Sequence, residues 1–84
     1  MDKKIIITVG HALYGDRWQT SLAHDLGLSD GRRIRQWLSD ERPIPAGLRG
    51  DLLRLLSERK MMLDDVLFHI TDIRRIYVLK GEKL

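Results

Sequence analysis

The sequence contains no cysteine among its 84 residues. Disulfide bonds and thiolate metal sites are therefore excluded, and an intracellular protein is the expected class. Unbroken apolar runs such as Ile5-Ile6-Ile7 are far too short to span a membrane. The start MDKK precedes an apolar stretch too short for a secretory signal. We expect a cytoplasmic protein of a bacterium, or of a phage-infected one, that does not interact with membranes.

Signals of catalysis and of metal binding are also missing. His11, His24 and His69 show no metal-ligand spacing, and no Gly-Lys-Ser/Thr follows any of the glycines. The order of the residues supports no Ser/His/Asp arrangement. The sequence therefore predicts a protein that is not an enzyme, with no cofactor, no metal and no evident small-molecule ligand.

The positive charge of the chain is concentrated in its middle third. The net charge is +3, and residues 31–60 carry eight basic residues against four acidic ones. Seven of those eight are arginines, whose planar guanidinium suits phosphate groups and guanine edges. On charge alone, a solvated helix face is an equal alternative. The hydrophobic fraction of 43% indicates one globular domain over residues 1–84, with a small core.

The two ends of the chain favour β structure. Residues 3–9 are rich in β-branched side chains and predict a strand or a stiff extended arm. Gly10 to Gly15 then predicts a helical turn or short helix. The tail Ile73 to Leu79 is also β-prone, so the two ends are expected to pair as a small antiparallel ribbon. The fold class predicted is mainly α, with four or five helices.

A helix is expected between Asp16 and Gly27. Thr20, or the capping box Asp16-x-x-Gln19, could cap its start, and Gly27 in a left-handed conformation would end it. Leu28 would then plug the turn. One apolar stripe at spacings of three and four marks the buried side of this helix: Trp18, Leu22, Ala23 and Leu26.

A second, shorter helix is expected from about Asp30 to Ser39, capped by Ser29. Its inner face would hold Ile34, Trp37 and Leu38, so both tryptophans are predicted to be core residues. The segment ERPIP is predicted as a loop, with Pro45 as the first residue of the next helix. The outward face is polar and basic: Arg32, Arg33, Arg35, Gln36 and Ser39.

The C-terminal half, residues 46–84, is predicted to support the domain and to join two copies. Apolar residues recur at helical spacing from Leu48 to Ile70, as one long helix or as two with a break near Arg59–Met62. They exceed what a small core needs, and the expected dimer interface is Met61, Met62, Phe68 and Ile70. Strand exchange through the ribbon is a second route to a dimer, and covering of these residues within one chain is the alternative.

Two helices joined by a tight turn, within about residues 19–39, follow the plan of a helix-turn-helix unit. The small side chain of Ala23 permits close approach of the two helices. The second helix would then protrude with its polar side free to enter a major groove.

The segment QTSLAHDLGLSDGRRIRQWL resembles the lambda-repressor-like, Xre/Cro-type DNA-binding domains of phage and bacterial regulators. Gln19 matches the family's glutamine at the front of the first motif helix, Ala23 its small residue and Gly27 its turn glycine. Ile34 and Leu38 match recognition-helix core positions. The resemblance covers about Leu13 to Leu56, and RPIP is similar to the lead into the next helix in short proteobacterial and phage proteins. One extra residue near Asp30-Gly31 predicts a longer turn or a later start of the recognition helix.

This resemblance implies sequence-specific binding of double-stranded DNA, by a homodimer on a palindromic operator, most simply as a repressor. The residues implied to touch bases are Asp30, Arg32, Arg33 and Gln36. Those implied to touch phosphates are Gln19, Thr20, Ser21, Arg35 and Arg42, with the backbone of Ala46 and Gly47. The alternative is a small helical interaction module, or an antitoxin-like subunit, whose basic face binds an acidic partner.

Overall fold

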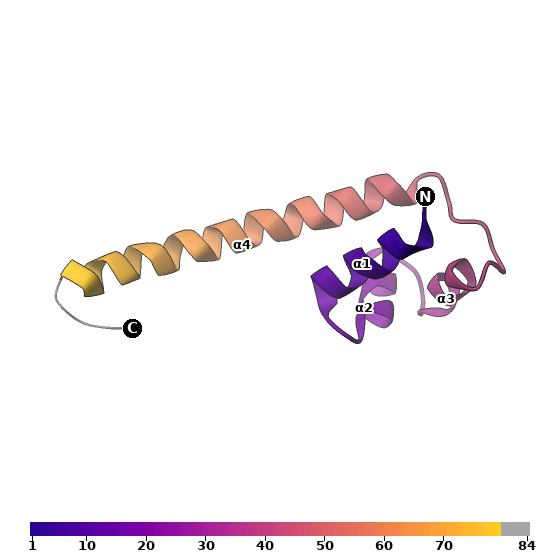
Figure 1. Cartoon of the computed structure of the whole chain (residues 1–84), viewed down its shortest axis with the longest axis horizontal. Coiled ribbons are helices and arrows are strands. Elements are labelled where there is room, and N and C mark those ends of the chain that lie inside the picture. Colours follow the sequence, from indigo (N-terminus) through magenta and orange to yellow (C-terminus); the bar gives the residue numbers. More distant parts are fainter. Residues whose placement is uncertain (80–84) are drawn as a thin grey trace.

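The computed structural model describes the backbone of residues 1–79 and the side chains of residues 1–71. Four helices, and no strands, occur in this part of the chain: α1 (Lys3–Tyr14), α2 (Trp18–Asp25), α3 (Arg32–Leu38) and α4 (Leu48–Leu79). Helices α1 to α3 and the first turns of α4 form a globular head, residues 1–59, from which the rest of α4 projects (Figure 1). We call residues 60–79 the distal α4. The molecule is accordingly elongated, measuring 59 × 22 × 22 Å.

The N-terminal segment is a helix, so the strand predicted for residues 3–9 is wrong. The Asp2 carboxylate caps α1 by accepting a hydrogen bond from the Lys4 N–H at 2.9 Å. Ile6 is buried while Ile5 and Ile7 are exposed, and Val9 continues the buried stripe. Burial at helical spacing therefore outweighs the β preference of the isoleucines.

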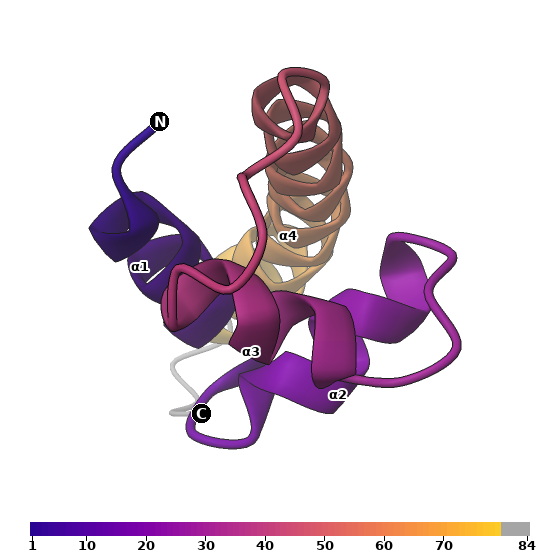
Figure 2. The same ribbon diagram turned by 90° about the vertical axis from the view of Figure 1, so that its right-hand side faces the viewer.

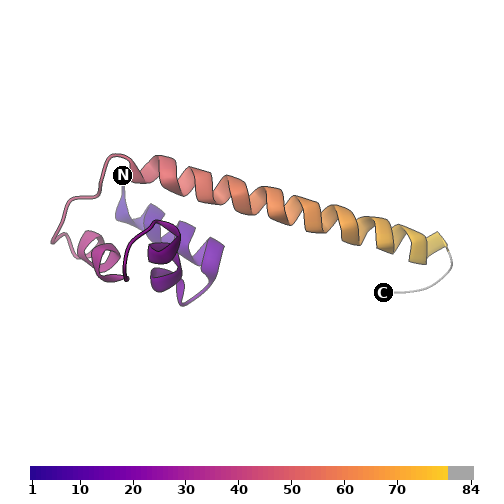
Figure 3. The ribbon, with the colours of Figure 1, turned by 180° about the vertical axis from the view of Figure 1, so that it is seen from behind.

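The β ribbon predicted from the two ends is wrong as well. Residues 73–79 form the last turns of α4, at the far end of the molecule from α1 (Figure 1). The C-terminal half is one unbroken helix of 32 residues, the first of the two predicted alternatives. It passes through Arg59–Met62 without a break, as the view from behind also shows (Figure 3).

The largest fully buried side chains of the core come one from each of the first three helices: Ile6, Leu22 and Ile34. Trp18 and Trp37 are each only 4% exposed, which confirms that both are core residues. Three leucines of α4 complete the core, and no polar side chain is buried among the described residues. The other buried members are Val9, Leu13, Ala23, Leu48, Leu52 and Leu55.

Contact between α1 and α2 depends on Gly10. Gly10 lies inside α1, not at the start of a separate turn, and it is buried. A Cβ atom at this position would overlap the indole ring of Trp18. Gly15 then ends α1 with φ of +78°, a conformation in which glycine is favoured, and its N–H donates to the His11 carbonyl. Gly10 thus leaves the space that the Trp18 indole fills, and Gly15 supplies the backbone conformation that ends α1 before α2.

A polar junction joins α1, α2 and α4. The Tyr14 hydroxyl donates to the Asp25 carboxylate at 2.5 Å, and the Arg59 guanidinium lies 5.7 Å from the centre of the Tyr14 ring. Burial, reinforced by the hydrogen bond with Asp25, raises the pKa of Tyr14 to about 12. The same hydrogen bond lowers the pKa of Asp25. These contacts lie where α4 leaves the head.

Candidate nucleic-acid interface

Helices α2 and α3 are joined by the tight turn predicted from the sequence. Gly27 has φ of +79° and its N–H donates to the His24 carbonyl, so its predicted left-handed conformation is confirmed. The Leu28 N–H donates to the Ala23 carbonyl at 2.8 Å, and the Leu28 side chain packs partly against the core. Ala23 is fully buried at this crossing. The turn therefore holds the segment that leads into α3 against the last turn of α2.

The starts of the helices differ from the predicted caps. Arg17 occupies the N-cap of α2 without a side-chain hydrogen bond, so neither Thr20 nor Asp16 caps it. Packing of Trp18 against α1 fixes where α2 begins, which leaves Thr20 exposed within the helix. Likewise α4 begins at Leu48, whose N–H donates to the carbonyl of Pro45, and not at Pro45 itself.

Helix α3 starts at Arg32, slightly later than the predicted start at about Asp30. The Asp30 carboxylate, and not the Ser29 hydroxyl, accepts a hydrogen bond from the first turn, from the Arg32 N–H at 2.8 Å. Its longer side chain reaches this N–H across Gly31. Asp30 thus lies in the turn and not on the helix.

Gly31 brings the start of α3 into contact with α2. It is buried, and a Cβ atom there would lie 3.1 Å from a guanidinium nitrogen of Arg35 and 3.8 Å from Gln19. The start of α3 therefore lies directly against Gln19 of α2. An added Cβ would meet only the movable end of the exposed Arg35 side chain at short range, so packing does not demand glycine at this position.

The two faces of α3 separate as predicted. Ile34 and Trp37 are buried and Leu38 packs partly against the core, while Arg32 and Arg33 are exposed. Arg35 is exposed and Gln36 half-buried. Seen from the end of the molecule, α3 lies in front and α4 runs away behind it (Figure 2). Helix α3 therefore lies at the end of the molecule opposite the distal α4.

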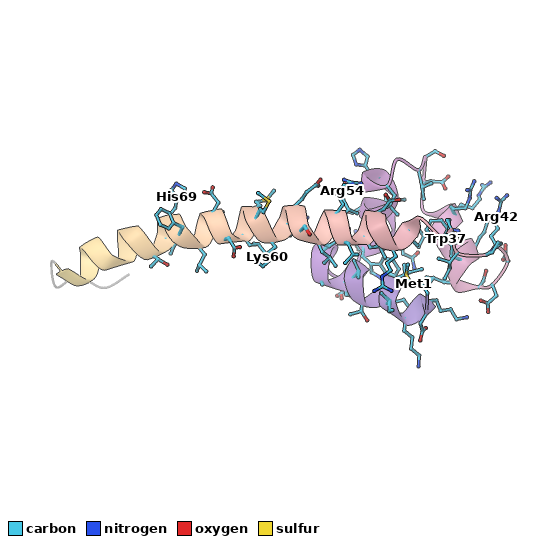
Figure 4. All side chains as sticks on the ribbon, turned by 90° about the horizontal axis from the view of Figure 1, so that it is seen from above. Met1, Trp37, Arg42, Arg54, Lys60 and His69 are labelled. Atoms are coloured by element: carbon cyan, nitrogen blue, oxygen red, sulfur yellow. The ribbon has the colours of Figure 1, made fainter. Side chains whose placement is uncertain are left out.

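The loop after α3 folds back toward this face. The Gln36 carbonyl accepts hydrogen bonds from the backbone N–H groups of Glu41 at 2.9 Å and Arg42 at 3.2 Å. Asp40 makes the reversal in the left-handed region, with φ of 64°, and its carboxylate pairs with the Lys3 ammonium at 2.9 Å. As a result Arg42 lies at the same outer end of the head (Figure 4).

One polar groove unites these side chains. It has a volume of about 270 Å³ and collects all four residues implied to touch bases together with Arg42. Its lining consists of Leu28, Ser29, Asp30, Arg32, Arg33, Gln36 and Arg42. Asp30 and Arg42 come from the turns on either side of α3, which sequence spacing alone could not place there.

The arginines of this end are free of carboxylate partners within the described side chains. None of the ion pairs found there involves Arg32, Arg33, Arg35 or Arg42. Elsewhere some cations are paired, as in Arg54–Glu58 at 3.2 Å. Unpaired guanidinium groups around one groove create a local positive potential, which attracts anionic ligands.

None of the other residues implied to touch phosphates lines the groove. Gln19 is half-buried beside Gly31, and Thr20 and Ser21 are exposed on α2. Gly47 lines a separate hollow of about 200 Å³ that Arg33 also borders. Ala46 is exposed in the loop before α4.

The four residues of the predicted dimer interface are all exposed, from 51% for Ile70 to 73% for Met61. They do not share one helix face. Met61 and Phe68 are seven residues apart and lie on the same side of α4, whereas Ile70 lies about 160° away from Phe68 around the helix axis, two residues further on.

Searches of known proteins found no matching family model, no similar curated protein and no similar solved structure. Within the part of the chain that the structure describes, no helix is long and apolar enough to cross a membrane. The described side chains also form no group of three or more His, Cys, Asp or Glu residues that could hold a metal ion.

Proposed function

We propose that this protein binds double-stranded DNA with sequence specificity, as a helix-turn-helix regulator and most simply a repressor. The observation that carries the proposal is the groove at α3, where unpaired arginines and Gln36 form one surface at the end of the head. In a helix-turn-helix complex, the second helix of the unit enters the major groove and the first crosses the backbone. In this chain α3 and α2 take these roles.

Each side chain of the groove has a role that follows from its chemistry. Arg32, Arg33 and Gln36 project from α3, where arginine would bind the O6 and N7 acceptors of guanine and glutamine the edge of adenine. Arg42 comes from the loop and would hold a phosphate, as would Gln19, Thr20, Ser21 and Arg35 around the groove. Asp30 would accept from a cytosine amino group.

Two copies are needed for a useful degree of specificity. One recognition helix reads only a few base pairs, and each correct pair contributes about 1–3 kcal/mol of discrimination. Two recognition helices about 34 Å apart would read successive major grooves of a palindromic operator. We therefore propose that the active species is a homodimer.

The test is a selection of random duplexes against the purified protein, followed by titration of the selected duplex at several salt concentrations. We expect affinity to fall steeply with salt, with a slope of about 0.9 for each phosphate contacted. Arg32→Ala or Arg33→Ala should cost about 1–3 kcal/mol of binding and relax the preference at one base pair. Arg42→Ala should weaken all duplexes about equally and reduce the salt slope by about 1.

Arg54→Ala is the matched control, because Arg54 is an exposed arginine of the head that lies outside the groove and pairs with Glu58. Its substitution should leave the selected sequence unchanged. Failure to bind any duplex at low salt would reject the proposal and favour the alternative, in which the arginines bind an acidic protein.

A further inference from the structure

A seam of mostly apolar and mostly exposed side chains runs along α4, beside the face that packs on the head. Its members recur at alternating spacings of three and four residues, which places them on one side of the helix. The face next to it, with Leu48, Leu52 and Leu55, is already buried by the head. The seam consists of Leu53, Leu56, Lys60, Leu63, Leu67 and Ile70. All of these are exposed except Leu56, which is half-buried.

Helix α1 borders the first half of this seam and turns it into a trough. A groove of about 220 Å³ lies between Leu53 of α4 on one side and Ile5 of α1 with the preceding Met1 on the other, and it is mainly apolar. Further along, a groove of about 320 Å³ lies between Ala12 of α1 and Leu63 of α4. The trough is therefore apolar and continuous with the exposed seam of the distal α4.

We propose that the α4 helix of a second copy occupies this seam, in parallel and in register, and so forms a two-stranded coiled coil. This proposal deepens the proposed function, because it specifies how the two copies join. One of the two arguments for a parallel orientation of the helices rests on that function. The occupant has the required chemistry, since a second copy presents the same apolar seam.

Charge complementarity gives the first argument for the parallel direction. Arg59 and Asp64 flank the seam on opposite sides and are five residues apart. This is the spacing at which a g position of one helix meets the e position of the other in a parallel coiled coil. Each Arg59 would therefore lie beside Asp64 of the second copy, twice per dimer. An antiparallel pair would instead bring matching flanks together, e beside e and g beside g.

The position of α3 gives the second argument. Helix α3 lies at the end of the molecule from which α4 runs away (Figures 1 and 2). A parallel pair therefore places both α3 helices at one end of the dimer, where both can reach one duplex. An antiparallel pair would place them at opposite ends.

Lys60 gives the seam its register. It is the one charged side chain among the six seam residues and occupies an a position, and its ammonium pairs with Asp64 at 3.2 Å. A single polar residue at an a position selects oligomer state and register at some cost in stability. Two lysines placed at the same level remain hydrated only in an open, two-stranded arrangement.

The first test is sedimentation equilibrium of the full chain without DNA, from low to high micromolar concentration. We expect a dimer, and Leu67→Asp should raise its dissociation constant by about 100-fold or more, because it places a carboxylate inside the seam. Phe68→Asp is the matched control: the neighbouring residue is equally exposed, at 63% against 62%, but lies off the seam. It should leave the dimer unchanged, with helicity by circular dichroism confirming that both variants fold.

A monomeric wild-type chain, a dimer insensitive to Leu67→Asp, or a dimer disrupted by Phe68→Asp would each overturn the proposal. The last result would favour the interface predicted from the sequence, of which only Ile70 belongs to the seam.

The second test uses the absence of native cysteine to determine direction. Lys60→Cys should oxidise to a covalent dimer, because a positions face their own counterparts in a parallel, in-register pair. Met61→Cys, next to it but off the seam, should not. Crosslinking of Met61→Cys alone, or of neither variant, would reject the parallel register. A crosslinked dimer that binds no duplex would reject the proposed function while leaving the seam intact.

Discussion

The head and the distal α4 use the same kinds of apolar residue in opposite ways. In the head, eleven hydrophobic side chains are exposed by 8% or less. From Lys60 to Thr71 every side chain is exposed, and the large apolar ones among them are 49–73% exposed. One continuous helix contributes to both regions, so the difference does not lie in helix propensity or in hydrophobicity. It lies in whether a neighbouring element covers the residues.

This difference shows which part of the molecule is self-sufficient. Helix stability in proteins comes mainly from packing of an apolar face, and isolated helices in water are marginal. The head supplies that packing from α1, α2 and α3. From Lys60 to Thr71, where the side chains of the distal α4 are described, none is buried within one chain. Contiguous apolar surface of this kind marks an interaction site. Matched substitutions in the two regions measure how far the head and the distal α4 behave independently.

The largest expected effect contrasts one aromatic residue from each region. Trp37→Ala should cost about 3–5 kcal/mol of unfolding free energy, because it empties a buried site in a small core. Phe68→Ala should cost less than about 0.5 kcal/mol, because the ring is exposed and off the seam. Thermal unfolding of the two variants, followed by circular dichroism, checks the contrast. Equal losses would show that the distal α4 contributes to the same core as Trp37.

The next contrast applies one substitution at two glycines. Gly10→Ala should destabilise the head by about 1–3 kcal/mol, because its methyl group meets the Trp18 indole. Gly50→Ala should stabilise the protein by up to about 1 kcal/mol, because Gly50 is exposed within α4 and no atom lies near its missing Cβ. Urea denaturation measures both changes. A loss of stability in Gly50→Ala would mean that another surface packs against the first turns of α4.

The smallest expected effect concerns the junction where α4 leaves the head. Tyr14→Phe should cost about 0.5–1.5 kcal/mol at neutral pH, because it removes the hydrogen bond to Asp25. The raised pKa of Tyr14 means that its contribution is complete below pH 10 and is lost as the pH rises toward about 12. The lowered pKa of Asp25 means that its contribution is lost as the pH falls below 3.8.

Urea unfolding across this pH range tests the junction. Wild type should lose stability at both extremes, and Tyr14→Phe should lose less of it at either one. A variant with an unchanged pH dependence would show that the Tyr14–Asp25 hydrogen bond does not contribute.

The main features of α2, the turn and α3 could be predicted directly from the sequence. The turn glycine at Gly27, the small residue Ala23 and the buried positions Ile34 and Trp37 follow from helix spacing and backbone preference, which act over a few residues. The same spacing assigned Arg32, Arg33 and Gln36 to one outer face. These features required no knowledge of distant contacts, and the structure contains all of them.

Tertiary packing decided what local preference could not. Residues 3–9 are helical because the head buries Ile6 and Val9 at helical spacing, which overrides the β preference of the isoleucines. Trp18 determines where α2 begins, and Gly10 is explained only by the Trp18 indole of α2 that lies against it. Arg42 joins the groove because the Gln36 carbonyl binds the loop. The sequence determined which helix faces are apolar. Which of these faces is buried within one chain depends on contacts between residues far apart in the sequence, and helical spacing does not encode those contacts.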